Sequence, residues 1–283
     1  MKFINTKILL TAAALSVSSG AFADQFNPFR VNESAIPGTT GADFQATKFT
    51  GTYTERFLVT GANTFTTTAF FTVASFSNFD GTQEQPVNPL ALNSFGANGY
   101  GLYGTFTASG SFSTTPGGGI NFTGLSANFN LFADLNQNTT IGYFAGQPNN
   151  IGFNITGGGD DQLLGSSNVL LAGGGQFTPG NVAFGNFAIL FGDFDGSANP
   201  TNGLTALGSQ YFYSPNPFYA VVRTSGQFDT FTLPTVGNAT QFGGSLDVRF
   251  NQVPEPSSLA LVGLALAGLG FAARRKASAD SRV

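Results

Sequence analysis

Two acidic residues lie at a spacing that is suited to chemistry. Asp193 and Asp195 flank Phe194, so on a β-strand both carboxylates would lie on one face. A carboxylate pair can serve a glycosidase or bind a cation. Because Gly196 follows directly, a solvated turn is the simpler interpretation, and we predict that the chain is not an enzyme.

A second acidic stretch has the start of a calcium loop. Asp134, Asn136 and Asn138 occupy the first, third and fifth positions, but Ala145 stands where the bidentate Glu would be. A polar turn with side-chain-to-backbone hydrogen bonds accounts for the same residues. Residues 157–163 resemble one calcium-binding nonapeptide turn, yet such turns work in tandem and this one is single. We therefore expect no cofactor, and calcium stays open as the one candidate ion.

Composition excludes several classes of site. The 283 residues include no His, Cys or Trp, so the chain alone cannot form a Ser-His-Asp triad, a thiol nucleophile, a zinc finger, a haem ligand or a disulfide. The formal net charge is −4 and no basic stripe is present, which argues against nucleic acid as a partner.

The middle of the chain is typical of an all-β protein. Apolar or small residues alternate with Thr, Ser and Asn along 65–73, 103–113, 120–123, 129–134 and 242–250, so each segment offers one face to a core. Glycine triplets at 117–119, 157–159 and 173–175 are expected to be turns before strands. No linker divides residues 24–252, so we predict one large two-sheet sandwich or jelly-roll-like body.

This body is acidic. Residues 24–252 contain 13 Asp or Glu and 5 Lys or Arg, which gives a charge of −8, and no basic residue occurs between Arg56 and Arg223. Such a surface could reach an anionic polymer through bridging divalent cations, whereas its many hydroxyl and amide groups suit neutral sugars.

The first 23 residues have the three parts of a secretory signal peptide. Lys2 and Lys7 form a basic start, an apolar stretch follows, and Ala21 and Ala23 supply a small-x-small cleavage site. We expect export through the Sec translocon, with the mature chain beginning near Asp24.

Residues 253–283 have the pattern of a membrane-sorting tail. Pro254, Glu255 and Pro256 precede an apolar stretch at 257–273, which is long enough for a short transmembrane helix, and Arg274, Arg275 and Lys276 follow. A basic cluster after the helix remains on the cytoplasmic side, which places the body outside. The simpler alternative is a plain membrane anchor.

This tail resembles the PEP-CTERM sorting signal. The resemblance implies recognition by an exosortase of a Gram-negative bacterium, with cleavage near Pro254–Pro256. It further implies transient anchoring in the inner membrane and delivery to the cell surface or the extracellular exopolysaccharide matrix.

A second resemblance lies at the start of the mature body. Residues 26–34, 36–38 and 44–55 look like the opening of flocculation-associated PEP-CTERM proteins of the PepA type. That resemblance implies a surface protein that supports flocculation or biofilm cohesion with exopolysaccharide.

Two other functions remain open. One is a glycan-binding module without a structural role, for which Tyr211, Tyr213 and Tyr219 are candidates for an exposed sugar-facing patch. The other is a carbohydrate-active enzyme that relies on Asp193 and Asp195.

Overall fold

The structure, a computed structural model, describes residues 27–94, 98–178, 183–190, 202–219, 221–228 and 232–251. It is nearly all β, as the alternation predicts, with one short α-helix (α2, Ala206–Tyr211) and one 3-10 turn (η1, Glu33–Ala35). The strands are β1 Phe29–Asn32, β2 Asp43–Ala46, β3 Lys48–Gly61, β4 Thr64–Phe79, β5 Glu84–Val87, β6 Gly101–Thr114, β7 Ile120–Asp134, β8 Thr140–Tyr143, β9 Phe153–Thr156, β10 Gln162–Ser167, β11 Leu170–Phe177, β12 Ala183–Leu190, β13 Gly203–Leu204, β14 Phe212–Ser214, β15 Val221–Phe228 and β16 Ala239–Asn251.

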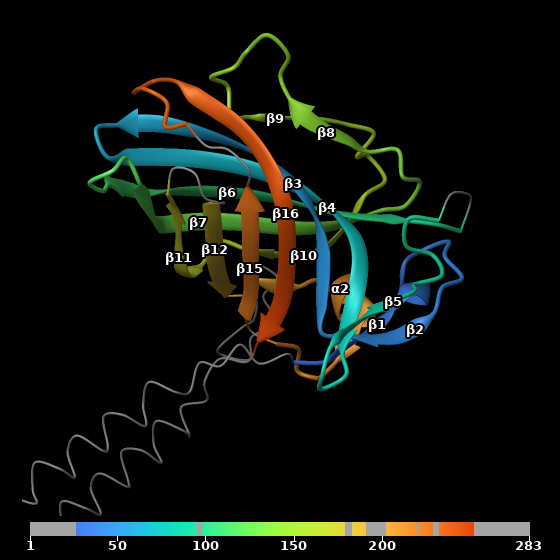
Figure 1. Cartoon of the computed structure of the whole chain (residues 1–283). Helices are drawn as coiled ribbons and strands as arrows, with labels where there is room; N and C mark the ends of the chain where they lie inside the picture. Colours follow the sequence, from blue (N-terminus) through green and yellow to red (C-terminus); the bar gives the residue numbers. More distant parts are fainter. Residues whose placement is uncertain are drawn as a thin grey trace, which may run out of the picture.

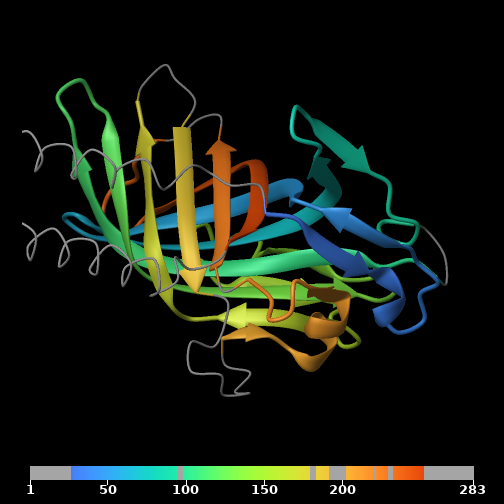
Figure 2. The same cartoon turned by 90° about the horizontal axis from the view of Figure 1, so that it is seen from below.

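One sheet dominates the molecule and curls until it closes on itself. Its neighbours follow the order β11, β12, β15, β16, β3, β4, β6 and β7, and a further pairing joins β7 back to β11, so these eight antiparallel strands form a closed ring. Figures 1 and 2 show the strands wrapping round a common interior. The two layers expected of a sandwich are therefore opposite walls of one curled sheet.

Strand β7 has two partners along one of its edges. Its first residues, Ile120–Thr123, pair with β11, whereas Phe129–Ala133 pair with β10. Strands β10 and β13 therefore continue the sheet outside the ring.

The inward and outward faces follow the alternation in the sequence. On the paired strands β6 and β7, Phe106 lies opposite Phe129 and Ala108 opposite Ala127, and all four side chains are buried. The turn that joins these strands contains Gly117 and Gly118, whose φ angles of 99° and 82° suit residues without a Cβ. The two strands therefore stay paired along their length, with one register shift between Ser109 and Gly110.

A small second sheet closes one end of the ring. It has the order β14-β1-β2 and lies beside α2 and β5 in Figure 1. Phe29 of β1 and Phe212 of β14 pack edge-to-face against Phe250 of β16, with ring centroids 5.1 and 5.3 Å apart. These rings belong to the larger of two core clusters. The smaller cluster, at the other end of the ring, contains Phe57, Val59, Phe65, Phe112 and Ile120.

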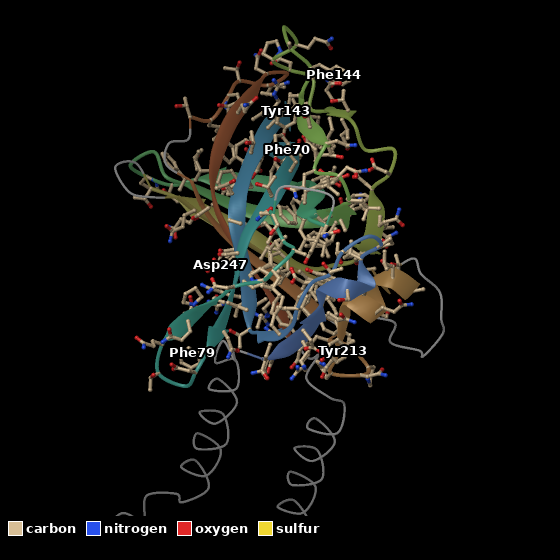
Figure 3. All side chains as sticks on the ribbon, turned by 90° about the vertical axis from the view of Figure 1, so that its right-hand side faces the viewer. Phe70, Phe79, Tyr143, Phe144, Tyr213 and Asp247 are labelled. Carbon is tan, nitrogen blue, oxygen red and sulfur yellow. The ribbon has the colours of Figure 1, made fainter. Side chains whose placement is uncertain are left out.

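The β8–β9 hairpin covers part of the outer face of β3 and β4. Tyr143 packs against Phe70 with a centroid distance of 5.6 Å, and Figure 3 shows both at the same end of the molecule. Within the described ranges, no helix has the length and apolar character needed to cross a membrane. The expected signal peptide (1–23) and sorting helix lie outside the described residues.

Candidate functional site: a cavity inside the ring

A cavity lies inside the ring and is lined by residues of both core clusters. Its empty space, counted to its open mouth, is about 840 Å³. Most of its walls are aromatic rings and glycines from β3, β4, β6, β7, β11, β12, β15 and β16. The lining residues are Tyr53, Glu55, Phe57, Phe65, Ala69, Phe71, Phe106, Phe122, Gly124, Phe129, Gly174, Gly175, Gly185, Thr224, Gly226, Phe242 and Leu246.

A row of glycines leaves part of this space empty. Gly175, Gly185 and Gly226 lie directly opposite one another on β11, β12 and β15. The same row continues to Phe122 on one side and Leu246 on the other, so it lies on the inward face. A Cβ at Gly185 would meet nothing within 4 Å. We expected the third glycine triplet to form a turn. It lies inside β11 instead, where the lack of side chains leaves space in the cavity.

Glu55 is the one acidic or basic side chain among the described residues that line the cavity. It lies on the inward face of β3, directly opposite Ala69 of β4 and Phe242 of β16. The Thr67 hydroxyl donates a hydrogen bond of 2.5 Å to Oε1. The carboxyl is enclosed by protein yet partly accessible, because it faces the cavity space.

Burial decides the charge of this carboxyl. Desolvation disfavours the ionised form and raises the pKa of Glu55 to about 7, although the hydrogen bond from Thr67 acts in the opposite direction. Glu55 therefore changes between a neutral acid and a carboxylate near neutral pH.

Arg56 does not neutralise this acid, because adjacent residues on a strand point to opposite faces. Its buried guanidinium lies on the outer face, 4.3 Å from the centroid of the Tyr143 ring. Nη1 donates to the carbonyls of Gln147 and Asn150 at 2.9 and 2.7 Å, and Nε donates to Gln241. Arg56 thus fastens the segment after β8 to the sheet.

The predicted calcium loop has its polar groups satisfied internally. The Asp134 carboxylate accepts hydrogen bonds from the backbone N–H groups of Asn138 and Thr139, at 3.1 and 3.0 Å. The side-chain amides of Asn136 and Asn138 donate to Asp160, which belongs to the second acidic turn. The structure therefore brings the two acidic stretches together, and it contains no cluster of three or more His, Cys, Asp or Glu in the described ranges that is arranged for a metal ion.

The tyrosine patch expected for sugar binding is wrong for two of its three members. Tyr211 and Tyr219 are buried, because they pack into the larger core cluster. Tyr213 is half-buried, and its hydroxyl donates to Asp43 at 2.6 Å while it accepts from Arg30 at 2.5 Å. Figure 3 shows Tyr213 at the end of the molecule that carries the small sheet.

Two acidic residues with defined roles in the structure, Glu33 and Glu55, are not among the site residues predicted from the sequence. Glu33 accepts hydrogen bonds from the backbone N–H groups of Ala42, Leu90, Ala91 and Leu92, so it fixes a loop to η1. Glu55 was detectable in principle. It occupies an inward position between Tyr53 and Phe57, where the alternation of β3 calls for an apolar residue.

An uncharged polar surface covers the outer face of β6 and β7. We call Thr105, Thr107, Ser109, Ser126, Asn128 and Asn130 the polar strip; they form three directly opposed pairs. Ser126 and Asn128 are exposed, Thr107, Ser109 and Asn130 are half-buried, and Thr105 is buried. Ser109 and Ser126 share a hydrogen bond of 2.7 Å, and Asn128 donates to Thr107 at 3.3 Å. Strands β6 and β7 contain one charged residue, Asp134 at the end of β7.

Most basic side chains of the body have acidic or carbonyl partners. Lys48 pairs with Glu84 at 2.5 Å and with Asp247 at 3.1 Å, on the face that Figure 3 labels with Asp247. Arg30 pairs with Asp43 at 2.6 Å, and Arg249 lies 3.7 Å from Glu84. The described surface therefore offers few free cations to an anionic partner.

The remaining site residues predicted from the sequence lie outside the described residues. These are Asp193 and Asp195, the cleavage residues Ala21 and Ala23, and the sorting residues Pro254, Glu255, Pro256, Arg274, Arg275 and Lys276.

Comparison with protein families gives one match, to the PEP-CTERM protein-sorting motif, over residues 252–276. The match contains all six predicted sorting residues and confirms the resemblance of the tail. Comparison with curated proteins and with solved structures gives no match.

Proposed function

We propose that this chain, which carries a PEP-CTERM sorting motif and is thereby an exported target of an exosortase, holds cells together in an exopolysaccharide matrix. The sorting motif is the observation that carries the proposal, because it marks the chain as an exported target of an exosortase. After processing, the body resides at the cell surface or in the matrix of a floc or biofilm. The proposal assigns no catalytic step to the chain.

The polar strip supports the contact with polysaccharide. Its hydroxyl and amide groups stand on a regular strand pair and can exchange hydrogen bonds with sugar hydroxyls. The strip carries no charge, so a neutral glycan segment suits it better than an anionic one. Each contact is weak, and many copies of the protein along one polymer would give cohesion through multivalency.

A deletion strain of the producing bacterium tests the role. Cells without the gene are expected to disperse, and the wild-type gene is expected to restore flocs. Glu255→Ala should fail to restore them, because it alters the sorting motif. Normal flocculation by the deletion strain would overturn the proposal.

A second arm separates polysaccharide contact from sorting. The double change Ser126→Ala and Asn128→Ala removes two exposed groups of the polar strip, and we expect normal export with weaker flocs. Asn154→Ala on β9 is the matched control, since it removes an exposed amide elsewhere. Equal floc strength in the two variants would remove the strip from the proposal and leave the surface role.

A further inference from the structure

The Glu55 carboxyl is under-satisfied for a group enclosed in an apolar cavity. Thr67 supplies one hydrogen bond, to Oε1, and the described residues provide no second one. A carboxylate can accept several hydrogen bonds, and Glu55 borders the space of the cavity, from which a bound group can reach it. This arrangement therefore points to a ligand group that completes the interactions of Glu55.

We propose that the cavity binds a small apolar amine, with its ammonium group at Glu55 and its hydrocarbon body among the phenylalanine rings. The inference is independent of the matrix role proposed above, since it concerns the interior of the ring rather than its outer face.

The charge of the ligand follows from the lining. Phenylalanine and tyrosine rings present a negative face, which attracts cations and disfavours anions. The described lining contains no Lys or Arg to hold an acidic head group, and the body is acidic. An ammonium group can make a cation–π contact with the aromatic rings and an ion pair with the carboxylate.

The size of the ligand follows from the volume. The enclosed part of the space is about 90 Å³, and the 840 Å³ also counts open solvent at the mouth, so the ligand is small and lies partly inside the ring and partly in the mouth. The Tyr53 ring lies over Gly226, whereas nothing lies within 4 Å of a Cβ placed at Gly185, so a flat one- or two-ring body can lie beside Gly185.

The neighbours of Glu55 leave few competing charges. Its partners Ala69 and Phe242 on the adjacent strands do not titrate, nor do the lining residues Thr224 and Gly226 of β15. Tyr53 shares the inward face of β3. On the outer face, Arg56 and Tyr143 lie next to each other, and burial raises the pKa of Tyr143 to about 12, so this hydroxyl stays neutral near pH 7.

Isothermal titration with isosteric probes tests the proposal. The full chain in lipid nanodiscs is titrated at pH 8 with 1-naphthylmethylamine, neutral 1-ethylnaphthalene and anionic 1-naphthylacetate, and signals from empty nanodiscs are subtracted. We expect the amine to bind at least tenfold more tightly than the neutral probe, with no binding of the anion. Lowering the pH to 5.5 should weaken amine binding by about 30-fold, because the ionised fraction of a group with a pKa of about 7 falls by that factor.

Two variants locate the amine. Glu55→Gln should remove the preference for the amine while it leaves the affinity for 1-ethylnaphthalene within about twofold. Gly185→Val places methyl groups in the open space and should weaken the binding of both the amine and the neutral probe. This variant tests the location of the site even where Glu55→Gln reduces folding. Equal affinity for amine and neutral probe, an unchanged preference in Glu55→Gln, or no binding of either probe would each overturn the proposal.

Discussion

Glu55→Gln should stabilise the protein above neutral pH. The pKa of Glu55 rises from 4.5 to about 7 on folding because the carboxyl is buried. Its protonated form is therefore favoured in the folded state, and the associated stability is complete below pH 4.5 and is lost as the pH rises through 7. Glutamine has nearly the same shape as glutamic acid and cannot ionise, so the variant does not lose this stability as the pH rises.

The expected magnitude follows from the shift. A rise of this size corresponds to about 3 kcal/mol in the free energy of unfolding at pH 8, as an upper limit. Water in the cavity screens part of the charge, so we expect the variant to exceed the wild type by about 2 kcal/mol at pH 8 and to equal it at pH 4.

Urea unfolding at half-unit steps from pH 4 to pH 8 measures this difference. Because the chain has no Trp, the transition is followed by near-ultraviolet circular dichroism of tyrosine, with the full chain in mild detergent. Asp80→Asn is the control. Hydrogen bonds from Thr82 and Gln83 hold the pKa of Asp80 far below its usual range, so its difference from the wild type should stay constant from pH 5 to pH 8. A pH-independent difference for Glu55→Gln would refute the burial argument.

Three further substitutions test single contacts, each by urea unfolding at pH 7. Arg56→Lys should lower the free energy of unfolding by about 2–3 kcal/mol, because one ammonium cannot replace the bonds to two carbonyls and the contact with the Tyr143 ring; a loss below about 0.5 kcal/mol would contradict this. Glu33→Gln should cost about 2–4 kcal/mol, because an amide offers one acceptor oxygen to four backbone N–H groups; the isosteric Gln176→Glu at an exposed position of β11 is expected to change little. Asp134→Ala should cost about 1–2 kcal/mol by freeing two backbone N–H groups, and a loss that appears only with added calcium would instead favour a bound ion.

The strands of this fold were predictable from the sequence, and their closure was not. Alternation along 65–73 and 103–113 identifies β4 and β6, because each strand buries one face. Closure depends on the pairing of Ile120–Thr123 with β11, about fifty residues further on. Local patterns carry no information on such a distant register, so two sheets and one curled sheet are equally consistent with them.

The cavity was hidden for a related reason. Glycines at 173–175 predict a turn when they are considered alone, whereas in the structure Gly175 lies beside Gly185 and Gly226 on the neighbouring strands β12 and β15. Only the pairing of the strands in three dimensions brings glycines from three separate segments together in one wall of the cavity. Glu55, by contrast, could be found from the sequence. It is an acidic residue at an inward position of β3, where the alternation predicts an apolar residue.

Strand β7 divides one edge between β11 and β10, so the β7–β11 junction, which we call the seam, is weaker than the other junctions of the ring. Four residue pairs join β7 to β11, whereas β7 and β6 share fourteen. Fewer backbone hydrogen bonds have to break at this seam, so transient opening of the wall starts there. The seam includes Phe122 and Gly175, which line the cavity. Transient opening of the ring at this line would therefore give a second way into the cavity, in addition to its open mouth.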